Sequence, residues 1–258
     1  MLIDNLEKIL KKYGKICVAY SGGTDSDFLL NMAAKILGKE NVLAVLAKGI
    51  MLSQKDFDDA LRLAQKCGVR LEIVEIDALS VGEFRNNTKE RCYFCKKNIM
   101  SKVIEKASQL GFDVVADGKN TDDGKVFRPG TKAASELGIV SPLFEAGFSK
   151  ADIRHWAQKE NIETWDKKSN SCLATRFPYD TLLTEDNLKA VEKAEYIIFS
   201  KGYSGARVRV HGDIARIEID KEDFKRFIED KDIAEDVKKQ GFKYVVLDLE
   251  GFRSGSMD

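Results

Sequence analysis

The residues best suited to chemistry form a short polar loop near the N-terminus. The loop follows an apolar run at residues 16–20 and precedes apolar residues from Phe28 to Leu37. Paired glycines let the backbone approach a phosphate closely, and the amides at the start of a helix point toward an anion. The sequence therefore predicts a phosphate-binding loop between a buried strand and a helix. Its expected ligands are Ser21, Gly22, Gly23, Thr24, Asp25 and Ser26.

Asp25 is unusual in such a loop, because its carboxylate would repel a phosphate. A divalent cation between the two groups would remove the repulsion. The carboxylate could also orient an attacking group, and in either role we expect Asp25 to be catalytic. No lysine follows Gly23, so the loop is not a Walker loop. The simplest alternative is a glycine turn with a serine that caps the helix.

The five cysteines differ in their surroundings. Cys17 and Cys67 fall in a predicted strand and on a predicted helix face, and we interpret them as small core residues. Cys92 and Cys95 form a CxxC pair between basic residues at a predicted helix start, where a thiolate is favoured. Cys172 lies in a polar loop and is the natural third partner. Two cysteines do not complete a structural zinc site, and a redox pair is the remaining alternative.

The elements that must position these residues alternate between strand and helix. Short apolar runs at residues 42–47, 71–76 and 114–116 predict strands, and the segments between them carry apolar residues at helical spacing. Strands that alternate with helices form parallel sheets with both faces covered. We therefore predict an α/β fold with a doubly wound, mostly parallel sheet.

The pattern changes near residue 185. A helix is followed by two alternating strands, a helical region and a last strand at residues 244–249. We expect two domains, a nucleotide-binding domain at residues 1–175 and a small α+β domain at residues 184–258. The second domain is assigned to substrate binding or oligomerisation.

The two alternating strands carry a row of charges. Gly212-Asp213 suits a two-residue hairpin turn, which would place Arg209 opposite Arg216 and Arg207 opposite Glu218. The second pair is an ordinary ion pair, whereas like charges directly opposite destabilise a sheet. An anion between Arg209 and Arg216 would relieve their repulsion. A solvated ladder, screened by water and salt, is the alternative.

The composition argues against two classes of protein. The chain has 258 residues and a formal net charge of zero, with 42 basic and 42 acidic residues. A protein that grips nucleic acid usually has a basic excess or a basic face. No apolar run approaches the length that spans a membrane, and the N-terminus lacks a secretory signal. We therefore expect a cytoplasmic protein whose cysteines are free, metal-bound or catalytic.

Six further segments, together with the loop, resemble one family. They are residues 117–123, 127–130, 141–143, 164–167, 171–176 and 247–251. The loop alone resembles the SGGxDS loop of the PP-loop ATP pyrophosphatases, whose fold is the adenine nucleotide alpha hydrolase-like fold. The combination is similar to the LarE-type ATP-dependent sulfur transferases and extends nearly from end to end.

The superfamily cleaves ATP to AMP and pyrophosphate and adenylates a carbonyl or carboxylate, from which a nitrogen or sulfur nucleophile displaces AMP. The resemblance implies that the loop holds the phosphates of ATP, with Asp25 near a Mg²⁺ ion. It also makes Gly118, Asn120 and Arg128 expected ATP-binding residues. For Gly118 alone, a plain turn after a strand is an equal alternative.

The LarE-type family makes the thiocarboxylates of the nickel-pincer cofactor from a pyridinium-3,5-biscarboxylic acid mononucleotide. In one branch, the cysteine at the position of Cys172 donates its own sulfur. In another, three cysteines hold a [4Fe–4S] cluster whose open iron binds hydrosulfide. The resemblance implies the cluster branch, with Cys92, Cys95 and Cys172 as ligands and sulfide or another sulfur donor. Sacrifice of Cys172 is the alternative.

The mononucleotide offers a phosphate and two carboxylates to the charged strands. Guanidinium groups bind phosphate with two parallel hydrogen bonds. We therefore expect substrate contacts from Arg176, Arg207, Arg209 and Glu218. The resemblance also implies a homo-oligomer. Two rival functions stay open: a tRNA thiolase with the same loop, and a sensor that binds ATP without releasing pyrophosphate.

Overall fold

The chain forms two compact units, each assembled from two stretches of sequence. The computed structural model describes residues 1–258 except 125–128, 169, 254–255 and 258. The first unit comprises Met1–Asp77 and Cys92–Asn170, and the second comprises Ala78–Arg91 and Ser171–Asp258.

The two units differ from the expected domains, residues 1–175 and 184–258, chiefly in the short segment 78–91. The segment belongs to the second unit. It is held there by backbone hydrogen bonds from Leu183 to Arg85 and from Asp180 to Asn87. The chain therefore enters the second unit, returns to the first, and enters the second again after residue 170. Such long-range contacts leave no local trace in the sequence.

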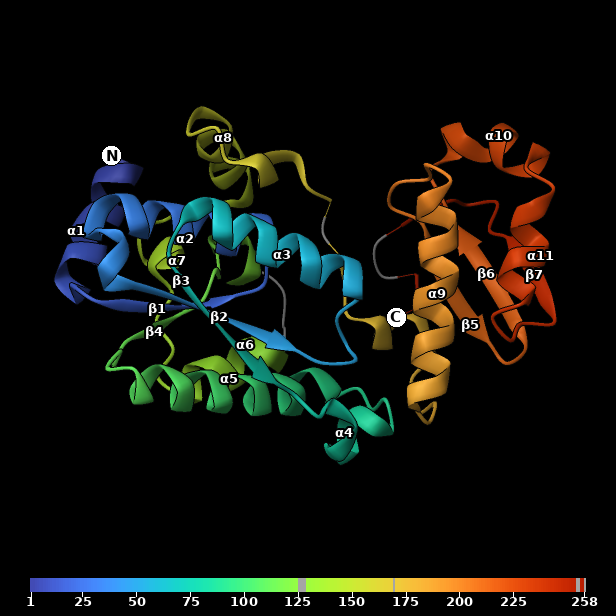
Figure 1. Ribbon diagram of the computed structural model, residues 1–258, viewed down its shortest axis with the longest axis horizontal. Helices are drawn as coiled ribbons and strands as arrows, with labels where there is room; N and C mark the ends of the chain where they lie inside the picture. Colours follow the sequence, from blue (N-terminus) through green and yellow to red (C-terminus); the bar gives the residue numbers. More distant parts are fainter. Residues whose placement is uncertain (125–128, 169, 254–255, 258) are drawn as a thin grey trace. The chain divides into compact units, whose positions relative to one another are not determined.

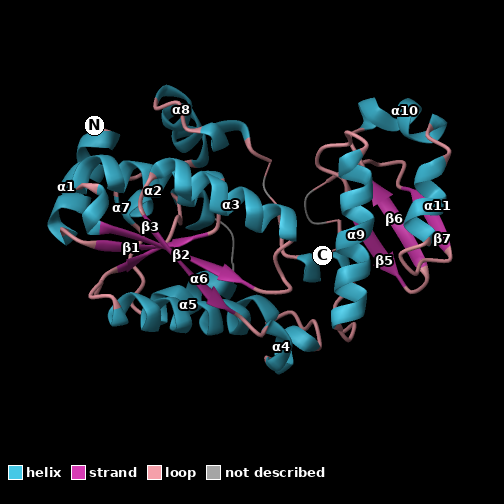
Figure 2. Cartoon of the chain, in the orientation of Figure 1, coloured by secondary structure: helices cyan, strands magenta, loops and turns pink. Residues whose placement is uncertain are grey.

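A four-stranded parallel sheet forms the centre of the first unit (Figures 1 and 2). The strands stand in the order β3-β2-β1-β4, and every neighbouring pair is parallel. Their bounds are Ile16–Tyr20 for β1, Val42–Lys48 for β2, Arg70–Glu75 for β3 and Val115–Ala116 for β4. Side chains of β1 and β2 are buried on both faces of the sheet, as parallel strands require. The predicted α/β fold is confirmed.

Helices cover both faces of this sheet (Figure 1). The helices on one side are α1 (Leu2–Tyr13), α2 (Thr24–Leu37), α3 (Gln54–Cys67) and α8 (Lys150–Lys159). The other side carries α5 (Arg91–Gln109) and α6 (Pro129–Glu136). Shorter helices are α7 (Pro142–Glu145), η1 (Lys39–Asn41), η3 (Thr121–Gly124) and η4 (Glu163–Asp166). A capping box starts α8, since Ser149 and Asp152 bond reciprocally.

The second unit packs a helix on a three-stranded sheet. The strands β5 (Arg207–His211) and β6 (Ile214–Glu218) are antiparallel, and β7 (Tyr244–Leu247) is parallel to β6. The helices are α9 (Glu185–Ser200), α10 (Phe224–Glu229) and α11 (Asp232–Lys238), with α4 (Gly82–Arg85), η2 (Ala78–Ser80), η5 (Leu173–Arg176) and η6 (Lys221–Asp223). Apolar residues on α9 and on one face of the sheet are fully buried and form the core. Across the described residues, no helix has the length and hydrophobicity to cross a membrane.

Candidate functional site

The polar loop between β1 and α2 has the conformation of a phosphate cradle. Gly22 has a φ of 67°, and a Cβ there would lie 2.6 Å from the Cβ of Ala60. Only glycine satisfies both constraints. The hydroxyl of Ser26 donates to the carbonyl of Gly23 at 3.1 Å and accepts from the amide of Ser21 at 3.3 Å. These bonds close the loop around the N-terminus of α2, where free amides favour an anion.

Asp25 meets the segment that follows β4. Asn120 Nδ2 donates to Asp25 Oδ2 at 3.1 Å, and the Asn120 side-chain oxygen accepts from the amides of Asp122 and Asp123. The amide of Asn120 is therefore oriented by its own loop. The structure brings together two residues that the sequence assigned to ATP, although they are separated by 95 positions.

Gly118 lies against the backbone of the phosphate loop. A Cβ at this position would be 2.8 Å from the amide nitrogen of Ser26 and 3.0 Å from the carbonyl carbon of Asp25. Close approach, rather than an unusual φ angle, is the reason for glycine here. A third expected ATP ligand, Arg128, lies outside the described residues.

The environment of Asp25 suits a divalent cation. Its second oxygen, Oδ1, is buried and has no hydrogen-bond partner among the described residues. A buried carboxylate oxygen without a partner is costly, so a ligand is expected there. Burial raises the pKa of Asp25; the charge of Lys150 opposes this shift, and that of Asp123 adds to it. A cation beside Asp25 would favour the ionised carboxylate.

Sequence reasoning missed a second network that holds the phosphate loop. Asp27 is buried and accepts hydrogen bonds from Tyr20 at 3.0 Å and from Thr164 Oγ1 at 2.9 Å. The hydroxyl of Thr24 donates to the carbonyl of Thr164 at 2.8 Å, and Lys167 Nζ donates to the carbonyl of Gly22 at 3.0 Å. In the sequence, the segment 164–167 is distinguished only by its resemblance to a family. Its physical role is to hold the start of α2 in place through these hydrogen bonds.

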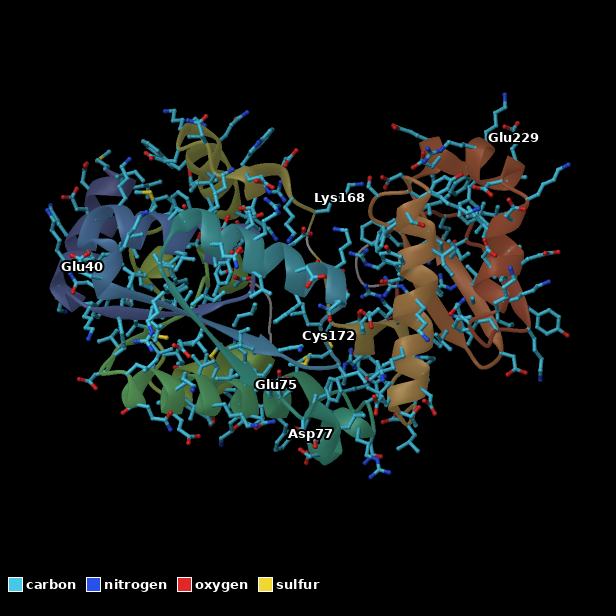
Figure 3. The ribbon with its side chains drawn as sticks, in the orientation of Figure 1. Glu40, Glu75, Asp77, Lys168, Cys172 and Glu229 are labelled. Atoms are coloured by element: carbon cyan, nitrogen blue, oxygen red, sulfur yellow. The ribbon has the colours of Figure 1, made fainter. Side chains whose placement is uncertain are left out.

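The cysteines have contrasting environments. Cys17 is fully buried, and burial raises the pKa of its thiol to about 12, which confirms the interpretation of a core residue. Burial also raises the pKa of the half-buried Cys67. Cys92 is exposed and Cys95 is buried near the start of α5, whereas Cys172 is half-buried immediately before η5. Figure 3 labels Cys172 in its loop.

Within the parts of the chain that the structure describes, no group of three His, Cys, Asp or Glu side chains is arranged to hold a metal ion. Cys92 and Cys95 belong to the first unit and Cys172 to the second. The three-cysteine site therefore stays a prediction.

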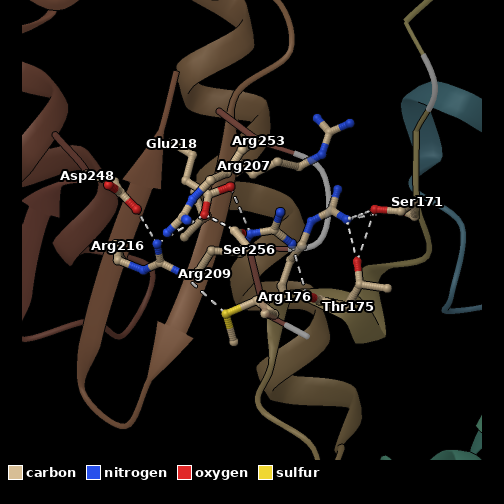
Figure 4. Close-up of polar contacts among 12 residues, drawn as sticks. Ser171, Thr175, Arg176, Arg207, Arg209, Arg216, Glu218, Asp248, Arg253 and Ser256 are labelled. Carbon is tan, nitrogen blue, oxygen red and sulfur yellow. Dashed lines mark hydrogen bonds and ion pairs between the residues drawn. The ribbon is translucent and has the colours of Figure 1, made fainter. Parts of the chain in front are cut away.

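The charged strands of the second unit have the expected register (Figure 4). Arg209 stands opposite Arg216, and Arg207 opposite Glu218. The repulsion between Arg209 and Arg216 is relieved differently from our expectation. Glu218 accepts from Arg209 Nε at 3.0 Å and pairs with Arg216 at 3.1 Å, and Arg216 also pairs with Asp248. Because Glu218 already bridges the two guanidinium groups, the repulsion is not evidence for a bound anion.

The other two arginines that we expected to contact the substrate are buried. Arg207 is 4% exposed, donates to the carbonyls of Ala206 and Gly205, and stacks on Phe252. Arg176 is fully buried and forms two bonds to Glu195, at 2.7 and 3.0 Å.

A second set of bonds from Arg176 supports the loop that carries Cys172. Its Nη1 atom donates to the hydroxyl and carbonyl of Ser171 and to the hydroxyl of Thr175. Figure 4 shows Arg176 directed at both residues. Arg176 thus fixes the conformation of the loop on either side of Cys172.

Comparison with known proteins places the chain in a family. A model of the NAD synthase family matches residues 1–108. The pyridinium-3,5-bisthiocarboxylic acid mononucleotide synthase of Lactiplantibacillus plantarum is 40% identical over 250 residues, which cover 96% of this chain and 91% of that protein. An uncharacterized protein of Methanocaldococcus jannaschii is 33% identical over 98% of this chain and 96% of its own length.

A more distant likeness covers about a third of the chain. The glutamine-dependent NAD(+) synthetase of Aquifex aeolicus is 32% identical over 90 residues, which are 34% of this chain and 16% of that protein. The synthetase match is partial, whereas the match that covers 96% of the chain includes both units. On these grounds the chain belongs to the family of pyridinium-3,5-bisthiocarboxylic acid mononucleotide synthases, the LarE-type sulfur transferases.

Proposed function

We propose that this protein is an ATP-dependent sulfur transferase. It adenylates a carboxylate of pyridinium-3,5-biscarboxylic acid mononucleotide and converts it to a thiocarboxylate. The observation that carries the proposal is the environment of Asp25: a buried carboxylate oxygen without a partner, beside a phosphate cradle that Asn120 and Gly118 complete. Family membership supplies the substrate class.

The first chemical step is the activation of the carboxylate. A carboxylate oxygen of the substrate attacks the α-phosphorus of ATP, the bond to pyrophosphate breaks, and an acyl adenylate forms. The loop amides and the hydroxyls of Ser21 and Ser26 hold the phosphates as negative charge accumulates on pyrophosphate. A Mg²⁺ ion held by Asp25 would neutralise part of that charge. Lys167 and Thr164 keep the loop in place through Gly22 and Thr24.

The second step is sulfur transfer. A sulfur nucleophile attacks the acyl carbon, and AMP leaves with the electron pair of the broken bond. Cys92 and Cys95 are three residues apart on α5 and so share a face of the helix, which suits two thiolate ligands. With Cys172 they would hold a [4Fe–4S] cluster, which would supply a site for hydrosulfide. Direct donation of sulfur from Cys172 is the alternative, and it needs no cluster.

The proposed substrate contacts lie in the second unit. Arg207 and Arg209 are buried guanidinium groups on one strand, and buried guanidinium groups bind phosphate strongly. Glu218 orients Arg209, while Arg176 positions the loop of Cys172. We also propose that the protein acts in the cytoplasm as a homo-oligomer.

An exchange assay tests the function. Incubation with ATP, Mg²⁺ and labelled pyrophosphate should return label to ATP only when the biscarboxylate mononucleotide is present, because the adenylate forms only on a carboxylate. Exchange that tRNA stimulates and the mononucleotide does not would identify a tRNA-modifying enzyme instead. ATP binding without any exchange would identify a nucleotide sensor.

A further inference from the structure

Arg91 is a buried cation of the second unit. It takes no part in the phosphate loop or in the charged strands described above. Its side chain is 6% exposed, and its Nη1 atom has no hydrogen-bond partner among the described residues. Its guanidinium lies 4.5 Å from the ring centre of Tyr179. A ring face attracts a cation, but it provides neither a counter-charge nor an acceptor in the guanidinium plane. A buried cation of this kind is expected to have an anionic ligand.

Two neighbouring side chains also have unused polar atoms. Thr88 Oγ1 and Asn87 Oδ1 are buried and have no partner in the described parts of the chain. The orientation of the Asn87 amide is determined, since its Nδ2 donates to the carbonyls of Phe177 and Pro178. Within five residues of sequence there are therefore a cationic donor, a hydroxyl and an acceptor. An oxyanion with a hydroxyl nearby would satisfy all three.

The backbone holds this segment rigidly. Asn87 is fully buried and has a φ of 51°, in the left-handed region that asparagine tolerates. Its carbonyl accepts from the amide of Asp180, and the carbonyl of Thr88 accepts from the amide of Arg91 at 3.1 Å. The unused atoms are thus held in a fixed turn, which is the condition for a preorganised binding site.

The same loop connects Arg91 to the charged strands. Arg209 donates to the carbonyl of Thr175 at 3.0 Å, and Arg91 stacks on Tyr179, four residues later. Four residues span at most about 14 Å of extended chain. A mononucleotide has anionic groups at both ends, so one molecule could reach both positions.

We propose that Arg91, Thr88 and Asn87 form a second anion subsite of the mononucleotide site, distinct from Arg207 and Arg209. Arg91 and Thr88 donate to an oxyanion of the substrate, and Asn87 Oδ1 accepts from one of its hydroxyl groups. This subsite rests on the proposed function, because that function supplies the ligand. The oxyanion is either a ring carboxylate or the phosphate, and these two sources can be separated by experiment.

The test is calorimetric titration of the full-length protein without ATP. The ligands are the biscarboxylate mononucleotide, nicotinic acid mononucleotide and nicotinamide mononucleotide, which carry two, one and no ring carboxylates. Arg91→Met should weaken binding of the biscarboxylate about 10- to 100-fold, as expected for loss of a charged hydrogen bond. Arg91→Lys should retain part of the affinity, and Thr88→Val should lose less than Arg91→Met. Arg85→Met is the matched control: it removes an exposed arginine from the same segment and should leave the affinity for all three ligands unchanged.

The pattern across ligands identifies the oxyanion. If Arg91 binds a carboxylate, Arg91→Met weakens binding of the two acids but not of the amide. If Arg91 binds the phosphate, all three mononucleotides lose affinity equally. The melting temperature of the ligand-free variant gives a separate readout. It should equal or exceed that of the wild type, because removing an uncompensated buried charge relieves a cost.

Two results would overturn the inference. In the first, the wild type binds the mononucleotides and catalyses exchange, but Arg91→Met and Thr88→Val bind all three ligands with unchanged affinity. This result would exclude the subsite and leave the proposed function intact. A wild type that neither binds the mononucleotides nor catalyses exchange removes both. If Arg91→Met fails to fold, Arg91→Lys and Thr88→Val decide the question in the same assay.

Discussion

Replacement of Gly118 by alanine provides the sharpest test of the adenylation site. The added methyl would lie 2.8 Å from the amide nitrogen of Ser26, and ordinary contact begins at 3.4 Å, so the phosphate loop must retreat by about 0.6 Å. The obstructing atoms belong to the backbone at the start of α2, so no side chain can rotate away. Misplacement of reacting groups by 1 Å costs about 100-fold in rate. We therefore expect kcat/KM for pyrophosphate exchange to fall about 10- to 100-fold.

Stability should change less than activity. Overpacking of this kind costs about 1–3 kcal/mol, which corresponds to a fall of about 2–12 °C in melting temperature for a chain of this size. Gly82→Ala is the matched control, because a Cβ there meets nothing within 4 Å. Exchange within twofold of wild type in Gly118→Ala would refute a role for the close contact between residue 118 and the phosphate loop, whatever happens to the melting temperature.

Three further experiments test separate parts of the mechanism. Asp25→Asn should reduce pyrophosphate exchange at least about 100-fold with an unchanged circular dichroism spectrum, and near-normal exchange would remove Asp25 from catalysis. Alanine at Cys92, Cys95 or Cys172 should remove most of the iron from anaerobically reconstituted protein, whereas alanine at Cys17 or Cys67 should not; iron-free wild type that loses the Cys172 sulfur on turnover would establish sacrifice instead. Arg209→Ala should raise the KM of the mononucleotide about tenfold and leave ATP affinity and iron content unchanged, and an unaltered KM would exclude Arg209 from the substrate site.

Features that depend on neighbouring residues could be predicted from the sequence. The phosphate loop and the hairpin register around Gly212 each arise from a few consecutive residues whose backbone preferences agree. Cys17 was recognised as a core residue because the apolar run around it admits only a buried strand. In these cases the local pattern and the final structure have the same physical cause.

Features that depend on distant residues could not be predicted. The bond from Thr164 to Asp27 joins positions 137 apart, and neither residue type is unusual where it stands. Glu218 was expected to pair with the residue directly opposite, but its carboxylate is shared by Arg209 and Arg216. Long side chains reach diagonal neighbours, so the register alone does not determine the ion pairs.

The division of the chain into two units has a consequence for the chemistry. Asp25, Gly118 and Asn120 lie in the first unit, and Arg91, Arg207 and Arg209 lie in the second. Each unit therefore carries its own network of buried polar groups, whose hydrogen bonds lie within that unit. Variants in the first unit should change ATP binding without changing mononucleotide binding, and variants in the second should do the reverse. Mutations at sites without shared partners are usually additive, so Gly118→Ala combined with Arg91→Met should show the two binding defects independently.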